Sequence, residues 1–244
     1  MKRAIHIATA TIFVLCLSGL LLAQSQWEKK PFTEWSDKDA QKLLSDSPWS
    51  QTQVFSDTSQ MTGTARQDSS SSRIANVFHV NFHIRFLSAK PVRQAISRSM
   101  ELKQKGAMPE QLAAQLKAFA AADFPDFIIV TALCDSDQAN IHLQEANARL
   151  NNRTTADLRN IAYLELKNGQ RLFLHEYQPP RNDGLGARFV FSRLADGKPF
   201  ITPEGGEVRF VADLSQGGTP TKMAYRLDRR FKISDMNFQG KLEY

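Results

Sequence analysis

Apolar and polar residues alternate strictly over residues 78–86, which is typical of a β-strand with one buried face. Helical spacing follows, because apolar residues recur every three or four positions over 92–100 and again over 109–120. Residues 127–133 form an apolar run in which Thr131 is the one polar side chain, which predicts a strand buried on both faces. A weaker helical pattern covers residues 138–150.

From residue 160 onward the period changes to two, which indicates a β-rich C-terminal half. Asn168 and Gly169 predict a hairpin with a type I′ turn, in which both central residues have positive φ. Short strands are expected further on, at residues 187–194, 207–213, 221–228 and 229–233. The predicted fold is α+β, an antiparallel β-sandwich or curled sheet with a helical insertion after its first strand.

A short helix bracketed by two tryptophans is predicted ahead of this domain. Ser36, followed by Asp39 three residues later, matches a capping box at the helix start. The residue before Pro48 is pushed out of the helical region, which ends the helix. Two turns of helix are not stable alone in water, so the segment must dock on something. It either closes onto its own domain or binds a partner through an apolar surface formed by Trp35, Leu43, Leu44, Pro48 and Trp49.

The following serine-rich stretch has few apolar side chains, so it reads as a flexible linker. This gives four expected regions along the chain. They are a signal peptide over 1–23, the tryptophan-bracketed helical segment over 24–55, the linker over 56–75 and the α+β domain over 76–244.

The first 23 residues have the pattern of a secretory signal peptide. Lys2 and Arg3 precede an apolar run, and Ala23 offers a small residue at the cleavage point. We expect export to the periplasm or the exterior, with no transmembrane segment after cleavage. Leu21, the third residue before the cut, is larger than the residue preferred there, so an uncleaved segment that anchors the chain in the membrane is the alternative.

Charge and cysteine content narrow the class of protein. The formal net charge of the whole chain is +6, but basic residues are interleaved with acidic ones rather than clustered, which argues against nucleic-acid binding. Cys16 lies in the predicted signal peptide, so Cys134 is the only thiol expected in the exported form. A single cysteine excludes an internal disulfide framework.

No motif in the sequence establishes a catalytic or metal site, and no cofactor is predicted. His79 and His83 fall on a predicted strand, about 13 Å apart at ~3.3 Å per residue, which is too far to share one ion. Cys134, with His142 or His175 as base, remains an alternative for a hydrolase with a non-standard site. A second alternative is a small-ligand carrier with an aromatic-lined cleft, suggested by the spacing of Phe189, Phe191, Phe210, Phe231 and Phe238.

Three patches of sequence resemble an uncharacterised family of exported proteins from Gram-negative bacteria. They are WSDKDAQKLLSDSPW, IRFLSAKPVRQA and the C-terminal SDMNFQGKLEY. The patches are spread over most of the chain beyond the signal peptide, so the resemblance implies export and a single functional unit. It transfers no activity, cofactor or site residue.

The sequence therefore favours an exported, non-enzymatic module that binds an envelope or extracellular protein. The tryptophan-bracketed segment is its expected contact surface, because a few aromatic anchors carry most of the affinity in such interfaces. The ligand carrier and the hydrolase remain open as alternatives.

Overall fold

The computed structural model describes residues 27–57, 78–137, 141–215 and 224–244. The predicted signal peptide and residues 58–75 of the predicted linker lie outside these ranges. The described helices are α2 (Asp37–Ser45), α3 (Lys90–Lys103), α4 (Glu110–Ala121), α5 (Ile141–Asn151) and α6 (Thr155–Leu158), with 3₁₀ turns η1 (Phe32–Glu34), η3 (Pro203–Gly205) and η4 (Ile233–Asp235). The described strands are β1 (Asp46–Ser47), β2 (Ser50–Asp57), β3 (Phe78–Phe86), β4 (Phe127–Asp135), β5 (Ala162–Leu166), β6 (Arg171–Phe173), β7 (Glu176–Gln178), β8 (Ala187–Ser192), β9 (Leu194–Ala195), β10 (Lys198–Pro199), β11 (Glu207–Asp213), β12 (Arg226–Lys232), β13 (Asn237–Phe238) and β14 (Lys241–Leu242).

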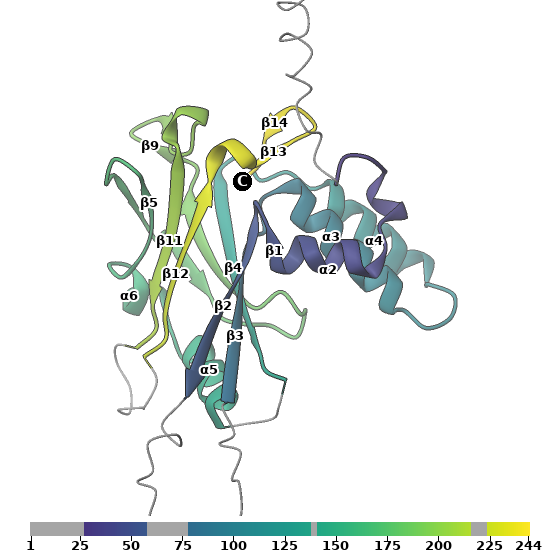
Figure 1. Ribbon diagram of the computed structural model, residues 1–244, viewed down its shortest axis with the longest axis horizontal. Coiled ribbons are helices and arrows are strands. Elements are labelled where there is room, and N and C mark those ends of the chain that lie inside the picture. The colour runs from purple at the N-terminus through teal and green to yellow at the C-terminus, as the bar shows by residue number, and fades with distance from the viewer. Residues whose placement is uncertain (1–26, 58–77, 138–140, 216–223) are drawn as a thin grey trace, which may run out of the picture.

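Two antiparallel sheets form the body of the molecule (Figure 1). The larger has the order β1-β2-β3-β4-β8-β7 and the smaller the order β12-β11-β5-β6. Aromatic side chains fill the space between them: Phe86 lies 4.9 Å from Phe231 between ring centres, and Phe189 lies 5.2 Å from Phe210. The predicted α+β fold with packed antiparallel sheets is therefore confirmed.

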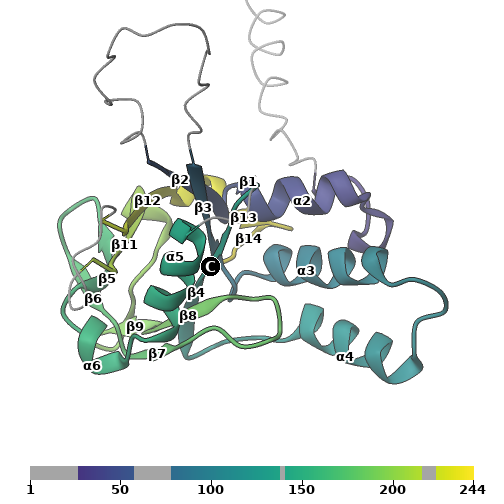
Figure 2. The same cartoon turned by 90° about the horizontal axis from the view of Figure 1, so that it is seen from below.

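The predicted helical insertion is also present. Helices α3 and α4 come between β3 and β4 in the chain and pack against each other beside the larger sheet (Figure 2). Helix α2 lies on the other side of α3, so the three form one layer. None of the described helices has both the length and the apolar character needed to cross a bilayer.

The N-terminal segment belongs to the same core as the rest of the protein. Strand β2 pairs with β3 over its whole length, from Ser50 opposite Arg85 to Asp57 opposite Phe78. The expected division between a tethered segment over 24–55 and a domain over 76–244 is therefore corrected, because residues 27–57 supply a strand and a helix to that domain. The sequence concealed β2, because Gln51 and Gln53 occupy positions where a core strand normally carries apolar residues.

Those two glutamines join the two sheets. The Gln53 amide donates to the Arg226 carbonyl oxygen at 2.9 Å and accepts from the Asp228 backbone N–H at 2.8 Å. The Gln51 amide donates to the Arg230 carbonyl oxygen at 2.6 Å. Side chains of β2 thus satisfy backbone groups on the outer edge of β12, which would otherwise be an open sheet edge.

Two local predictions need correction. The hairpin at Asn168–Gly169 exists, with Tyr163 opposite Phe173, but only Gly169 has positive φ, so the turn is not type I′. The strands expected at 221–228 and 229–233 are one strand, β12, with residues 221–223 outside the described part. Arg229 lies on the buried face of that strand, between Leu227 and Phe231. A charged residue at a buried position interrupts the alternation, so the sequence suggested two strands where there is one.

Candidate functional site

The predicted partner-binding surface is part of the protein's own core. Trp35, Leu43 and Trp49 are at most 1% exposed, Leu44 is 5% exposed, and Pro48 is half-buried. The Trp49 indole N–H donates to the Glu243 carbonyl oxygen at 2.9 Å. These side chains stabilise the fold and are not available to a partner in this structure. Of the two alternatives left open by the sequence, docking on the same domain is the one observed.

The capping box that starts this segment has the predicted geometry. The Ser36 hydroxyl accepts from the Asp39 N–H at 3.2 Å, and the Asp39 carboxylate accepts from the Ser36 N–H at 2.9 Å. The ammonium of Lys30, 2.7 Å from the same carboxylate, and the Ser36 donors lower the pKa of Asp39 to about 2. The helix start is therefore held by a carboxylate that stays charged except in strong acid.

Cys134 is a buried residue rather than a nucleophile. Its thiol donates to the Asn147 side-chain oxygen at 3.4 Å, and burial together with the charge of Asp135 raises its pKa to about 12. The thiolate that nucleophilic chemistry requires is therefore strongly disfavoured. His142 is buried in α5, and the His175 ring lies 5.6 Å from the Phe127 ring.

The aromatic row does not line a cleft. Its members are at most 2% exposed and pack on one another or on neighbouring rings, as in the contacts of Phe189 with Phe210, of Phe191 with Phe210 and of Phe238 with Trp49. The interpretation as sheet core is the one that their burial supports.

A row of polar side chains crosses the outer face of the larger sheet on three adjacent strands. Thr52 of β2 is directly opposite His83 of β3, and its Oγ1 lies 3.0 Å from His83 Nδ1. His83 Nε2 lies 2.8 Å from a carboxylate oxygen of Asp135, at the end of β4. The antiparallel registers bring together a hydroxyl, an imidazole and a carboxylate that are far apart in the sequence. We call these three residues the polar relay.

The proton positions in the polar relay follow from its chemistry. An ionised carboxylate only accepts hydrogen bonds, so the neutral His83 ring carries its proton on Nε2 and leaves Nδ1 as an acceptor. The Thr52 hydroxyl then has one proton and two acceptors in reach, His83 Nδ1 and the Ser45 carbonyl oxygen at 3.1 Å. The His83 side chain is 14% exposed and that of Asp135 56% exposed, so the relay runs from solvent into a covered position.

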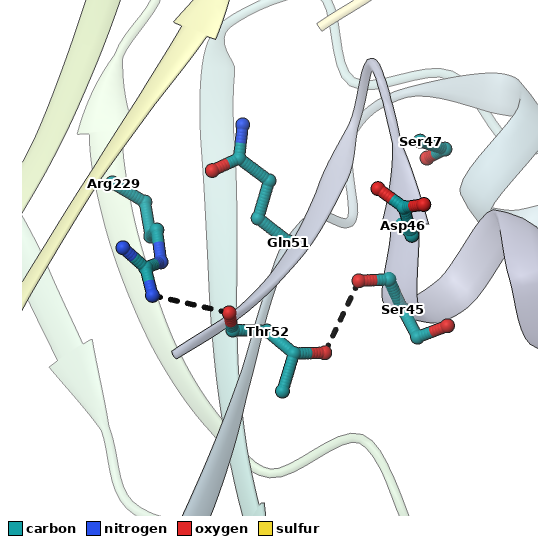
Figure 3. A pocket seen from close by; sticks show the side chains of 6 residues that line it. All are labelled: Ser45, Asp46, Ser47, Gln51, Thr52 and Arg229. Atoms are coloured by element: carbon teal, nitrogen blue, oxygen red, sulfur yellow. Dashed lines mark hydrogen bonds between the residues drawn. The ribbon is translucent and has the colours of Figure 1, made fainter. Parts of the chain in front are cut away.

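Thr52 also lines an open hollow of about 450 Å³. Chain reversal at Pro48–Trp49 folds residues 45–47 back over Gln51 and Thr52, because β1 and β2 form a tight hairpin directly after α2. Figure 3 shows Arg229 approaching from the β12 side, where its Nη2 donates to the Thr52 carbonyl oxygen at 3.1 Å. The wall is wholly polar: Ser45, Asp46, Ser47, Gln51, Thr52 and Arg229.

Arg229 lacks the ion pair that its neighbours have. Arg230 lies 3.4 Å from Glu207, and Arg226 lies 3.9 Å from Asp228. No carboxylate among the described residues lies within 4 Å of the Arg229 guanidinium, and its Nε is buried with no acceptor in that part of the chain. The hollow therefore contains a partly desolvated positive charge that forms no ion pair with a described carboxylate.

A second hydroxyl–imidazole pair lies further along the same two strands. The Ser56 hydroxyl is 2.8 Å from His79 Nδ1. No carboxylate of the described residues contacts the His79 ring, so within that part of the chain this pair has no third member. Neither histidine joins a metal-binding group, since the described residues contain no cluster of three or more His, Cys, Asp or Glu side chains suited to an ion.

No protein-family model, no curated protein and no solved structure matches this chain. Sequence analysis placed both histidines on one strand but missed their partners, because β2 was not recognised as a strand and no local pattern pairs Asp135 with His83. Arg229 gave only a weak signal, a lone arginine where the alternation of β12 calls for an apolar residue.

Proposed function

We propose that this protein is exported and binds an acidic segment of another polypeptide at the hollow beside Thr52. The observation that carries the binding proposal is the Arg229 guanidinium, which lines the hollow and has no carboxylate partner among the described residues. A half-buried arginine with no described carboxylate within 4 Å costs desolvation energy that a ligand carboxylate would offset. The proposed contact surface therefore lies on β1, β2 and β12, and not on the tryptophan-bracketed segment that the sequence suggested.

The lining also favours a particular class of ligand. Asp46 contributes a carboxylate to the same wall, so a dense polyanion would be repelled there. Hydroxyl and amide groups supply further donors and acceptors. An extended peptide fits this mixture, because its acidic side chain reaches the guanidinium while its backbone N–H groups face Asp46. Nucleic acid is disfavoured for the same reason.

The export proposal rests on the residues that precede the fold. The positive start, apolar run and small residue at Ala23 support cleavage by a signal peptidase. The resemblance to exported Gram-negative proteins supports the same location, in the periplasm or outside the cell. Expression in a Gram-negative host, followed by fractionation and N-terminal sequencing, is expected to find a chain beginning at Gln24 outside the cytoplasm. A full-length chain in the membrane fraction would instead support the uncleaved anchor.

Binding is tested with fluorescent peptides that each carry one glutamate, matched with peptides in which glutamine replaces it. Fluorescence anisotropy is expected to show tighter binding of the acidic set. Arg229→Gln should weaken that binding about tenfold or more, because hydrogen bonds to charged groups contribute about 1.5–3 kcal/mol.

Arg230→Gln is the matched control, since it removes the same charge from an exposed, paired neighbour on the same strand. Equal loss in both variants would mean that only the overall charge matters, and the proposal would be abandoned.

A further inference from the structure

The polar relay ends at the wall of the hollow, where it has the arrangement of a nucleophile, a base and an orienting acid. We infer that the hollow is also a reaction site, in which Thr52 Oγ1 attacks an ester of a carboxylate-bearing acyl group. The inference rests on the proposed function in one respect: Arg229 holds the acidic group of the substrate. It reopens the hydrolase alternative with residues that replace Cys134, His142 and His175.

The distances suit general-base activation of a hydroxyl. Thr52 Oγ1 is 3.0 Å from His83 Nδ1, within the range expected for a nucleophile and its base. Asp135, 2.8 Å from His83 Nε2, fixes the tautomer with a free Nδ1 lone pair and stabilises the imidazolium that forms. Asn81 donates to the other carboxylate oxygen of Asp135 at 3.0 Å, which orients that carboxylate in turn.

The reaction balances without a cofactor. Thr52 Oγ1 forms a bond to the ester carbonyl carbon while its proton passes to His83 Nδ1. The bond between that carbon and the alkoxy oxygen breaks, and the proton on Nδ1 passes to the departing alcohol. Water then attacks the acyl group on Thr52, loses a proton to Nδ1, and the proton returns to Oγ1. The net change is ester plus water to acid plus alcohol.

The position of Arg229 sets the expected substrate preference. Its guanidinium contacts the backbone carbonyl oxygen of Thr52 itself, so a carboxylate bound at Arg229 lies beside the residue that carries the nucleophile. The Ser45 carbonyl oxygen competes for the hydroxyl proton.

The Ser56–His79 pair provides an internal control. It has the same hydroxyl–Nδ1 contact on the same two strands, but no described carboxylate on its histidine and no place in the lining of the hollow. A reaction of any surface hydroxyl next to a histidine would use both pairs. A reaction that needs the whole site would use Thr52 alone.

The experiment uses mono-4-nitrophenyl succinate as the carboxylate-bearing ester and 4-nitrophenyl acetate as the neutral one. Nitrophenol release is followed at several pH values, and the acyl adduct is located by peptide mass mapping. We expect succinylation of Thr52. After release without protein is subtracted, because the succinate ester also reacts through its own carboxylate, we expect faster release from the succinate ester than from the acetate ester. Thr52→Val, which keeps the side-chain shape, should abolish the adduct, whereas Thr52→Ser should retain it.

His83→Gln should slow release by about 100-fold or more, the usual contribution of a general base. Ser56→Ala should react like the wild-type protein. Melting curves confirm that each variant is folded. Absence of an adduct on Thr52 in the folded wild-type protein, or undiminished release by Thr52→Val, would overturn the inference.

The two proposals can fail separately. Tight binding of acidic peptides without acylation of Thr52 would overturn the reaction and leave the binding proposal intact. Acylation of Thr52 without a preference for the succinate ester, unchanged in Arg229→Gln, would support the nucleophile and overturn the role of Arg229 in holding the acidic group.

Discussion

At the scale of single residues, the behaviour of the polar side chains depends on the hydrogen-bond donors and acceptors that surround each of them. Thr52 has two acceptors for one proton, and Asp39 has two kinds of donor for one carboxylate. The capping box was predictable because its members are three residues apart in the sequence. The polar relay was not, since its members come from three strands whose pairing no local pattern reveals.

Asp39 gives a prediction for acid stability. Its pKa is about 2 in the folded protein, below its ordinary value of 3.8, because Lys30 and Ser36 stabilise the charged form. The unfolded chain therefore binds the proton first, so this stabilisation is complete above about pH 4 and is lost as the pH falls towards about 2. Urea unfolding at pH 6 and pH 2 should show a larger stability difference between wild type and Asp39→Asn at pH 6.

Asp37→Asn is the control, because it also removes an acid from the first turn of α2 but leaves the capping box intact. Its effect should be smaller at pH 6. An Asp39→Asn effect that is equal at both pH values would show that Lys30 and Ser36 do not hold the charge as described.

At the scale of elements, β2 pairs with β3 and joins the two sheets, and it is the strand least visible in the sequence. Its inward positions carry Gln51 and Gln53, which serve the edge of β12 instead of an apolar core. The strand over 78–86 was predictable because apolar and polar residues alternate along it. The strand over 127–133 was predictable because it is a short apolar run. Hydrogen bonds from glutamine side chains to the backbone of a distant strand leave no periodic pattern of apolar residues in the sequence.

The seam between β2 and β12 predicts a local change in hydrogen exchange. Gln53→Ala removes the side-chain oxygen that accepts from the Asp228 N–H, so that amide should exchange about fivefold faster, corresponding to about 1 kcal/mol. Gln51→Ala is matched to it, because Gln51 contacts Arg230 and not Asp228. Equal exchange of the Asp228 amide in both variants would mean that Gln53 does not protect this edge.

At the scale of the whole molecule, the N-terminal segment closes the fold against its C-terminal end. Trp49 donates to the Glu243 carbonyl oxygen and packs against Phe238, 6.1 Å away between ring centres. The α+β class, the helical insertion and the sheet core followed from hydrophobic periodicity. The single-core arrangement did not, because a serine-rich stretch between two segments looks the same whether they dock together or apart.

Trp49 provides the stability test of this arrangement. Trp49→Ala should lower the free energy of unfolding by about 3–5 kcal/mol, the usual cost of removing a large buried aromatic side chain. Trp49→Phe should cost less, since it keeps most of the apolar area and loses the indole hydrogen bond, worth about 1 kcal/mol. Urea titration measures both. A change below about 0.5 kcal/mol for Trp49→Ala is typical of a surface position and would restore the partner-binding interpretation.

The measurement that tests the central functional claim most directly is an NMR titration of the ¹⁵N-labelled protein with an acidic peptide. The Arg229 Nε–H is buried and has no acceptor among the described residues, so its resonance reports on the hollow itself. The account predicts saturable shifts of this resonance together with the backbone amides of Asp46 and Thr52, and none with the glutamine peptide. Shifts centred on another face of the molecule, with Arg229 Nε unmoved, would contradict it.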